Sequence, residues 1–161
     1  MALTTNGSLV NAKRAEALLD AGLGMVDFSL DAHQADTFHQ IRVGLSFERT
    51  IANVHRFIEL RDARGSDCRV MVSFVKQTLN VDEAQRLRDY WSPLVDEVLV
   101  REMTSNVGLN TPSARQIPGQ ATRWPCPHFF RRIVVNHLGR VKACPIDWRQ
   151  ATTNLSVGQA S

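Results

Sequence analysis

The sequence lacks the features that mark secreted and membrane-spanning proteins. It has only three cysteines, and this odd number argues against a scaffold held together by disulfides. The longest apolar stretch, residues 70–75, is interrupted by Ser73 and is far too short to cross a membrane. Residues 1–10 contain no basic segment followed by an apolar one, so no secretory signal is visible. We therefore expect a cytoplasmic protein that does not engage a membrane.

A strong excess of charge is also missing. The chain has 19 basic and 16 acidic residues, and its net charge of +3 is too small to bind nucleic acid by charge alone. Apolar residues make up 43% and charged residues 22%, as in ordinary folded domains. One group of basic residues does gather late in the chain, at Arg123, Arg131, Arg132, Arg140, Lys142 and Arg149. No known nucleic-acid-binding module accompanies them, so we expect a solvated basic surface and no nucleic-acid partner.

Two hydrophobic periods alternate along the first hundred residues. Patterns typical of strands lie at residues 1–5, 25–30, 69–75 and 94–100. Helical patterns lie between them, at residues 12–19, 47–58 and 84–91. Ser46 is the expected N-cap of the second helix, and residues 80–83 resemble a capping box for the third. This alternation predicts an α/β fold with a parallel sheet and right-handed crossovers.

The pattern changes after residue 102. Residues 103–122 are rich in proline, glycine and polar residues, which predicts a linker. Within residues 123–149, two short apolar segments on either side of residues 136–139 predict a β-hairpin, with Gly139 able to take a positive φ. Residues 150–161 are small and polar, and we expect them to form a flexible tail.

Polar residues follow the first two predicted strands, at the edge where parallel sheets carry their chemistry. Ser29 and Asp31 end the second strand and would face the mouth of the sheet, where they suit a ribose or an amino group. Asp31 could equally cap a turn, and that is the simpler interpretation. Thr5 and Asn6 lie in a similar strand-to-helix turn, whose Asn6-Gly7 pair could also approach a ligand closely.

The cysteines Cys126 and Cys144 flank the predicted hairpin, so the fold could bring the two thiols together. Thiolates are natural ligands for zinc or an iron–sulfur cluster, and His128 and His137 could complete a zinc site. Two free thiols or a disulfide remain the alternatives. Cys68 opens an apolar strand, and we expect it in the core.

Several segments, in their order and spacing, resemble the radical S-adenosylmethionine enzyme family. Those similar to the middle of the family's barrel are Leu3–Leu9, Leu18–Gly22, Phe28–Ala32, Thr37-Phe38 and Ile41-Arg42. Pro125–His128 and Gly139–Asp147 resemble the opening of its C-terminal SPASM or twitch extension. The resemblance covers residues 2–148. It implies a partial (β/α) barrel of parallel strands over residues 1–102, followed by a small cysteine-bearing hairpin over residues 123–149.

The resemblance implies S-adenosylmethionine as a cofactor and assigns residues to it. Ser29 and Asp31 match the strand end that faces the ribose or the amino-acid part of this cofactor. Arg42 matches an arginine near the cofactor's carboxylate, where a charge-assisted hydrogen bond is physically sensible. Thr5 and Asn6 would line the barrel mouth near the cofactor or the substrate.

The resemblance also implies 4Fe–4S clusters. In the family, a catalytic cluster reduces S-adenosylmethionine, and the resulting adenosyl radical abstracts hydrogen from the substrate. Cys126 and Cys144 match ligands of an auxiliary iron–sulfur cluster. A peptide or protein substrate is the implied partner, together with a reductant protein such as a flavodoxin or ferredoxin.

The sequence departs from the family at two points. The Cys-x3-Cys-x2-Cys loop that binds the catalytic cluster is absent, and no cysteine follows Cys144. The chain therefore resembles an internal piece or a degenerate relative, and we expect it to be catalytically inactive by itself. An open half-barrel would expose its sheet edges, so we also expect marginal stability or self-association. The alternative is a non-catalytic metal- or partner-binding domain derived from this fold.

Overall fold

The computed structural model describes residues 1–103 and, beyond them, residues 131, 133–136, 138–139 and 141–142. The chain forms two compact units, Met1–Met103 and Thr104–Ser161, and each is described by itself. The predicted tail lies outside the described residues, and so does the predicted linker after Met103. Among the residues that the structure describes, no helix combines the length and apolar character needed to cross a membrane.

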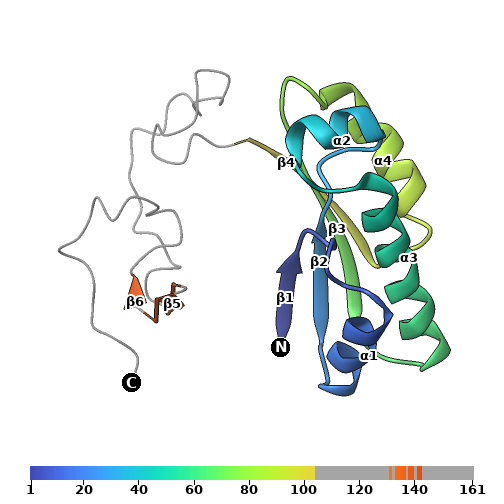
Figure 1. Ribbon diagram of the computed structural model, residues 1–161, viewed down its shortest axis with the longest axis vertical. Coiled ribbons are helices and arrows are strands. Elements are labelled where there is room, and N and C mark those ends of the chain that lie inside the picture. Colours follow the sequence, from blue (N-terminus) through green and yellow to red (C-terminus); the bar gives the residue numbers. More distant parts are fainter. Residues whose placement is uncertain (104–130, 132, 137, 140, 143–161) are drawn as a thin grey trace. The chain divides into compact units, whose positions relative to one another are not determined.

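The first unit is built on a four-stranded parallel sheet, which confirms the predicted α/β class. Its strands are β1 (Ala2–Thr5), β2 (Met25–Ser29), β3 (Arg69–Lys76) and β4 (Glu97–Glu102). They lie side by side in chain order, β1-β2-β3-β4 (Figure 1). Each strand is therefore hydrogen-bonded to the next one along the chain, with a helical connection between them.

The helices of this unit are α1 (Ala12–Asp20), α2 (Ala35–Ile41), α3 (Phe47–Ala63) and α4 (Ala84–Trp91), with a short 3₁₀ turn, η1 (Val81–Glu83), before the last. Because crossovers between parallel strands are right-handed, a sequential strand order places the helices on one face of the sheet. Figure 1 shows α1, α3 and α4 on the same side. No helix of the described residues covers the opposite face of the sheet, which we call the helix-free face.

The hydrophobic core lies between the sheet and these helices. Alternate residues of the central strands point into it, and Phe28 of β2 meets Phe57 of α3 edge-to-face, with ring centroids 5.6 Å apart. Trp91, at the end of α4, is the largest fully buried side chain. Burial of each large apolar side chain contributes about 1.5–3 kcal/mol, so this single layer of contacts is the main source of stability.

Local signals in the sequence set the helix ends. The Ser46 hydroxyl accepts a hydrogen bond from the Arg49 amide at 3.2 Å, as predicted for an N-cap. Backbone hydrogen bonding at this helix start, aided by the Ser46 hydroxyl, holds the pKa of the Glu48 carboxyl below its usual value. Gly22 has φ +72° just after α1, and this is the left-handed conformation expected of a glycine that ends a helix.

Three local predictions were wrong. Helix α2 lies in a stretch that the sequence pattern left as a loop. Strand β4 begins at Glu97 rather than Leu94, because the amides of Leu94 and Val95 still donate to the Trp91 carbonyl beyond α4. The capping box at residues 80–83 is not formed: Asn80 caps no helix with its side chain, and η1 intervenes.

The described residues of the second unit form an antiparallel hairpin, in part as predicted. Strand β5 (Val134–Val135) pairs with β6 (Val141–Lys142). Gly139 has φ +73°, and its amide donates to the Asn136 carbonyl at 3.0 Å. Both observations fit the predicted turn at residues 136–139.

Gly7 is the position in the β1–α1 turn where a side chain is least acceptable. It has φ +77°, and an added Cβ would lie 3.2 Å from Cδ1 of Phe28. We expect Gly7→Ala to lower the free energy of unfolding by roughly 2–4 kcal/mol, because backbone strain adds to overpacking of the core. Gly65→Ala is the matched control, since Gly65 has φ +58° but open space around it. Equal losses in urea denaturation would show that the contact with Phe28 contributes nothing.

Candidate functional site

Ser29, Asp31 and Arg42 come together at the C-terminal end of β2, and we call them the Arg42 cluster. The Arg42 Nη2 atom donates to Ser29 Oγ at 2.6 Å and to Asp31 Oδ2 at 2.5 Å. The Asp31 side chain is 7% exposed and that of Arg42 is 26% exposed. Ser29 and Asp31, which the sequence places at the mouth of the sheet, are thus joined by one guanidinium nitrogen of Arg42.

The backbone around the cluster is fixed from several directions. Asp31 has φ +59°, an uncommon conformation for a residue with a side chain. Its Oδ1 accepts from the Val75 amide of β3 at 2.8 Å, and its carbonyl accepts from Asn80 Nδ2 at 2.7 Å. Arg42 directly follows α2, where its amide donates to the Phe38 carbonyl at 2.7 Å. The cluster is therefore held by β2, β3, the β3–α4 turn and α2 together.

The hydrogen bonds of the cluster decide what it can still bind. Both carboxylate oxygens of Asp31 are occupied, one by Arg42 and one by Val75. Arg42 uses only Nη2, and its Nε is buried without a partner. A guanidinium has five N–H donors, so Arg42 keeps donors that a ligand oxygen could accept. The resemblance predicts that Arg42 binds a ligand carboxylate. In the structure Asp31 already balances the charge of Arg42.

Thr5 and Asn6 make the turn after β1. Thr5 Oγ1 accepts from the Gly7 amide at 3.2 Å, and Asn6 Oδ1 accepts from the amide and hydroxyl of Ser8. Thr5 lies beside Phe28 in the register, on the helix-covered side of the sheet, whereas Ser29 lies on the other side. The structure thus places both side chains in the turn and does not join them to the Arg42 cluster.

Cysteine chemistry falls largely outside the described residues. Cys126, Cys144, His128 and His137 all lie there. Cys68 is buried in the core, as predicted, and burial raises the pKa of its thiol. Within the described part of the chain, no group of three His, Cys, Asp or Glu side chains could hold a metal ion.

Glu83 is a buried residue at this edge, which the sequence pattern placed only in a capping box for the helix at residues 84–91. Its Oε2 accepts from the amides of His33 and Gln34 at 2.6 and 3.0 Å, and its Oε1 accepts from Thr37 Oγ1 at 2.5 Å. The carboxylate therefore caps α2 from almost fifty residues away. A tertiary cap of this kind has no signal in the local sequence.

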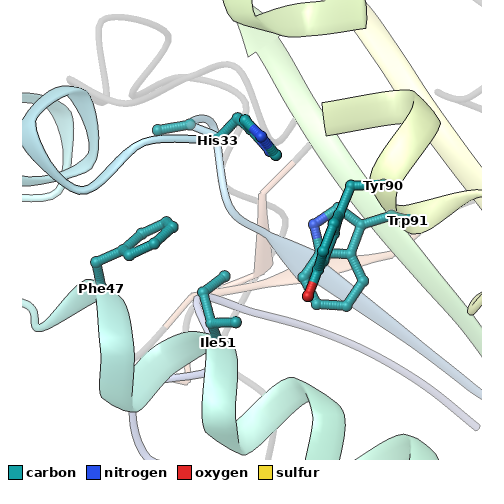
Figure 2. Close-up of a pocket in the computed structure, with 6 residues that line it drawn as sticks. His33, Phe47, Ile51, Tyr90 and Trp91 are labelled. Carbon is teal, nitrogen blue, oxygen red and sulfur yellow. The ribbon is translucent and has the colours of Figure 1, made fainter. Parts of the chain in front are cut away.

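A hollow lies on the helix-covered side of the sheet, between α3, α4 and the loop after β2. It has a volume of about 200 Å³ and is lined by Ala32, His33, Phe47, Ile51, Tyr90 and Trp91 (Figure 2). Two of its walls are braced by His55, which stacks on Trp91 at 5.0 Å and shares a 2.9 Å hydrogen bond with the Tyr90 hydroxyl. The hollow can take an apolar group. In the sequence, the helical spacing of its lining residues indicates only positions in the core.

No protein-family model matches the chain, and no curated protein matches it.

Proposed function

We propose that this chain is part of a radical S-adenosylmethionine enzyme and that the Arg42 cluster binds the cofactor. The enzyme would act on a peptide or protein substrate, with Cys126 and Cys144 as ligands of an auxiliary iron–sulfur cluster. The observation that carries the proposal is that Arg42 joins Ser29 and Asp31 at the C-terminal end of β2. These are three of the five residues that the family resemblance assigns to the surroundings of the cofactor.

The architecture of the first unit supports the barrel part of the proposal. Strands in sequential order with helices on one face are the repeating unit of a (β/α) barrel. In the described residues, β1 and β4 each pair on one side only. Further strands could add at both edges and curve the sheet toward closure, with the helix-free face inside.

The described residues fit S-adenosylmethionine in chemical terms. The cofactor carries a carboxylate and ribose hydroxyls, which accept hydrogen bonds, and Arg42, whose side chain is 26% exposed, has N–H donors left for them. Ser29 is half-buried and lies beside the guanidinium, so its hydroxyl can meet the ribose. Asp31 holds the same guanidinium nitrogen in place. When bound, the cofactor supplies the reactive adenosyl group, and these residues orient it.

The described residues do not fit a 4Fe–4S cluster. Cys68 is the one cysteine among them, and it is buried in the core beside the start of β3, away from the C-terminal strand ends. We therefore derive no step through a cluster from this chain's described residues. We expect the chain by itself to bind the cofactor without turning it over.

Calorimetric titration of the full chain with S-adenosylmethionine tests the proposal. We expect binding, with a dissociation constant that rises about fivefold in Ser29→Ala, because one hydrogen bond worth about 1 kcal/mol is lost. Ser29→Ala leaves the contact between Asp31 and Arg42 in place. Ser92→Ala, at an exposed position beyond α4, is the matched control and should change nothing. Absence of binding would contradict the proposal, and so would equal affinity in the two variants.

A further inference from the structure

Asp27 lies in the middle of β2, on the helix-free face. Its neighbours along the strand, Val26 and Phe28, point into the core, so Asp27 points the other way. In the register it lies between Thr4 of β1 and Met71 of β3. Ser29 follows two residues later on the same face, about 6–7 Å along the strand. Asp27 therefore lies next to the Arg42 cluster, one step deeper along the sheet.

This carboxylate is buried and has no partner among the residues that the structure describes. Asp27 is 8% exposed, and its Oδ1 is fully buried without a hydrogen bond. No hydrogen bond or ion pair joins Asp27 to any residue that the structure describes. A buried, unpaired carboxylate opposes folding, so buried charges in proteins are normally paired. Asp27 therefore contributes nothing visible to the fold, and a ligand that supplies the missing donor would remove its cost.

The charges around Asp27 indicate the sign of that ligand. Asp27, Asp31 and Arg42 together carry two negative charges and one positive charge, and Asp31 already holds Arg42 at 2.5 Å. Arg69, which also lies on the helix-free face, pairs with Glu97 at 3.6 Å. The cationic side chains nearest in the register are thus engaged elsewhere, and the site has an unbalanced negative charge.

We propose that Asp27 binds a primary ammonium group of the ligand that occupies the helix-free face. An ammonium has three donors, which suits one carboxylate flanked by the hydroxyls of Thr4 and Ser29. A divalent metal ion would require more ligating groups than the described residues offer. The inference rests on the proposed function only in calling this ligand the substrate: an amine-bearing molecule such as a peptide with a lysine side chain. The binding of the cation itself is independent of S-adenosylmethionine.

The test uses amide NMR spectra of the full chain, titrated with butylammonium and with the isosteric neutral butan-1-ol at matched ionic strength. We expect butylammonium to shift the amide signals of Thr4, Asp27 and Ser73 in a saturable manner, and butan-1-ol to leave them unchanged. Asp27→Asn preserves shape and should weaken butylammonium binding about tenfold or more, as expected for loss of a charge-assisted hydrogen bond. Asp36→Asn, at an exposed position on α2, should bind like the wild type.

Three results would overturn the proposal. The first is saturation by butan-1-ol equal to that by butylammonium, and the second is the absence of any shift with either; both are read on the wild-type chain without a variant. The third is equal affinity for butylammonium in Asp27→Asn and the wild type. The melting temperature of Asp27→Asn supplies a further check. We expect it to equal or exceed that of the wild type, whereas a clear decrease would show that Asp27 has a partner in the fold. Failure of the S-adenosylmethionine titration alone would leave these results intact.

Discussion

Replacing Arg42 by methionine is expected to lower the free energy of unfolding by about 2–4 kcal/mol, because it leaves the buried Asp31 carboxylate without its counter-charge. Asp31 is 7% exposed, so water cannot replace the guanidinium. The loss should fall short of that for a fully buried pair because Arg42 is itself 26% exposed and Asp31 keeps its bond from the Val75 amide. Urea denaturation of both proteins measures the difference.

Arg56→Met is the matched control for this prediction. Arg56 also pairs with a carboxylate, that of Glu59 at 3.3 Å, but both side chains are more than half exposed. Removing it should change the stability by less than about 0.5 kcal/mol. Adding Asp31→Asn to Arg42→Met should recover part of the loss, since the uncompensated charge is then gone. The prediction fails if Arg42→Met costs no more than Arg56→Met.

The regular elements were predictable because their hydrophobic periods are strong. β2 and the first six residues of β3 are apolar on the core side, and α3 repeats its apolar residues at helical spacing over about three turns. Helix α2 was not predicted because it is short and buries only Phe38. Its cap comes from Glu83 rather than from its own N-cap residue, Gln34. A seven-residue helix of this kind depends on tertiary contacts, so its local sequence carries little signal.

Of the five residues that the sequence analysis expected near a cofactor, three lie in contact with one another, and the contacts between them could not be predicted. Position after β2 was enough to single out Ser29 and Asp31, and the family resemblance added Arg42. The sequence could not show that Arg42 would be balanced by Asp31, because that contact depends on where α2 ends. Asp27 did have a signal, since a carboxylate between Val26 and Phe28 must face away from the core. Only the structure shows that none of the described residues pairs with it.

Asn80→Ala is expected to lower the free energy of unfolding by about 2–4 kcal/mol, because Asn80 connects the strand ends that carry the site. It is 1% exposed, its Nδ2 donates to the carbonyls of Asp31 and Val75 at 2.7 and 3.0 Å, and its Oδ1 accepts from the Gln77 amide at 2.6 Å. Alanine would leave these backbone groups without their hydrogen-bond partner. Each buried group that loses its partner lowers the free energy of unfolding by about 1–3 kcal/mol if the surroundings do not adjust. Urea denaturation measures the total, and amide hydrogen exchange at Gln77 reports the local effect.

Asn80→Asp separates hydrogen bonding from packing at this position. Aspartate keeps the shape and can still accept from the Gln77 amide, but it cannot donate to the two carbonyls and adds a negative charge close to Asp31. It should therefore destabilise the protein at least as much as alanine does, whereas a purely steric role for Asn80 would make it nearly neutral. Gln85→Ala removes an exposed amide on α4 that bonds only Asp89, at 2.7 Å, and should stay within about 0.5 kcal/mol of the wild type. Because Asn80 fixes the Asp31 carbonyl beside its positive φ, its loss should also loosen the Arg42 cluster and weaken S-adenosylmethionine binding in the titration proposed above.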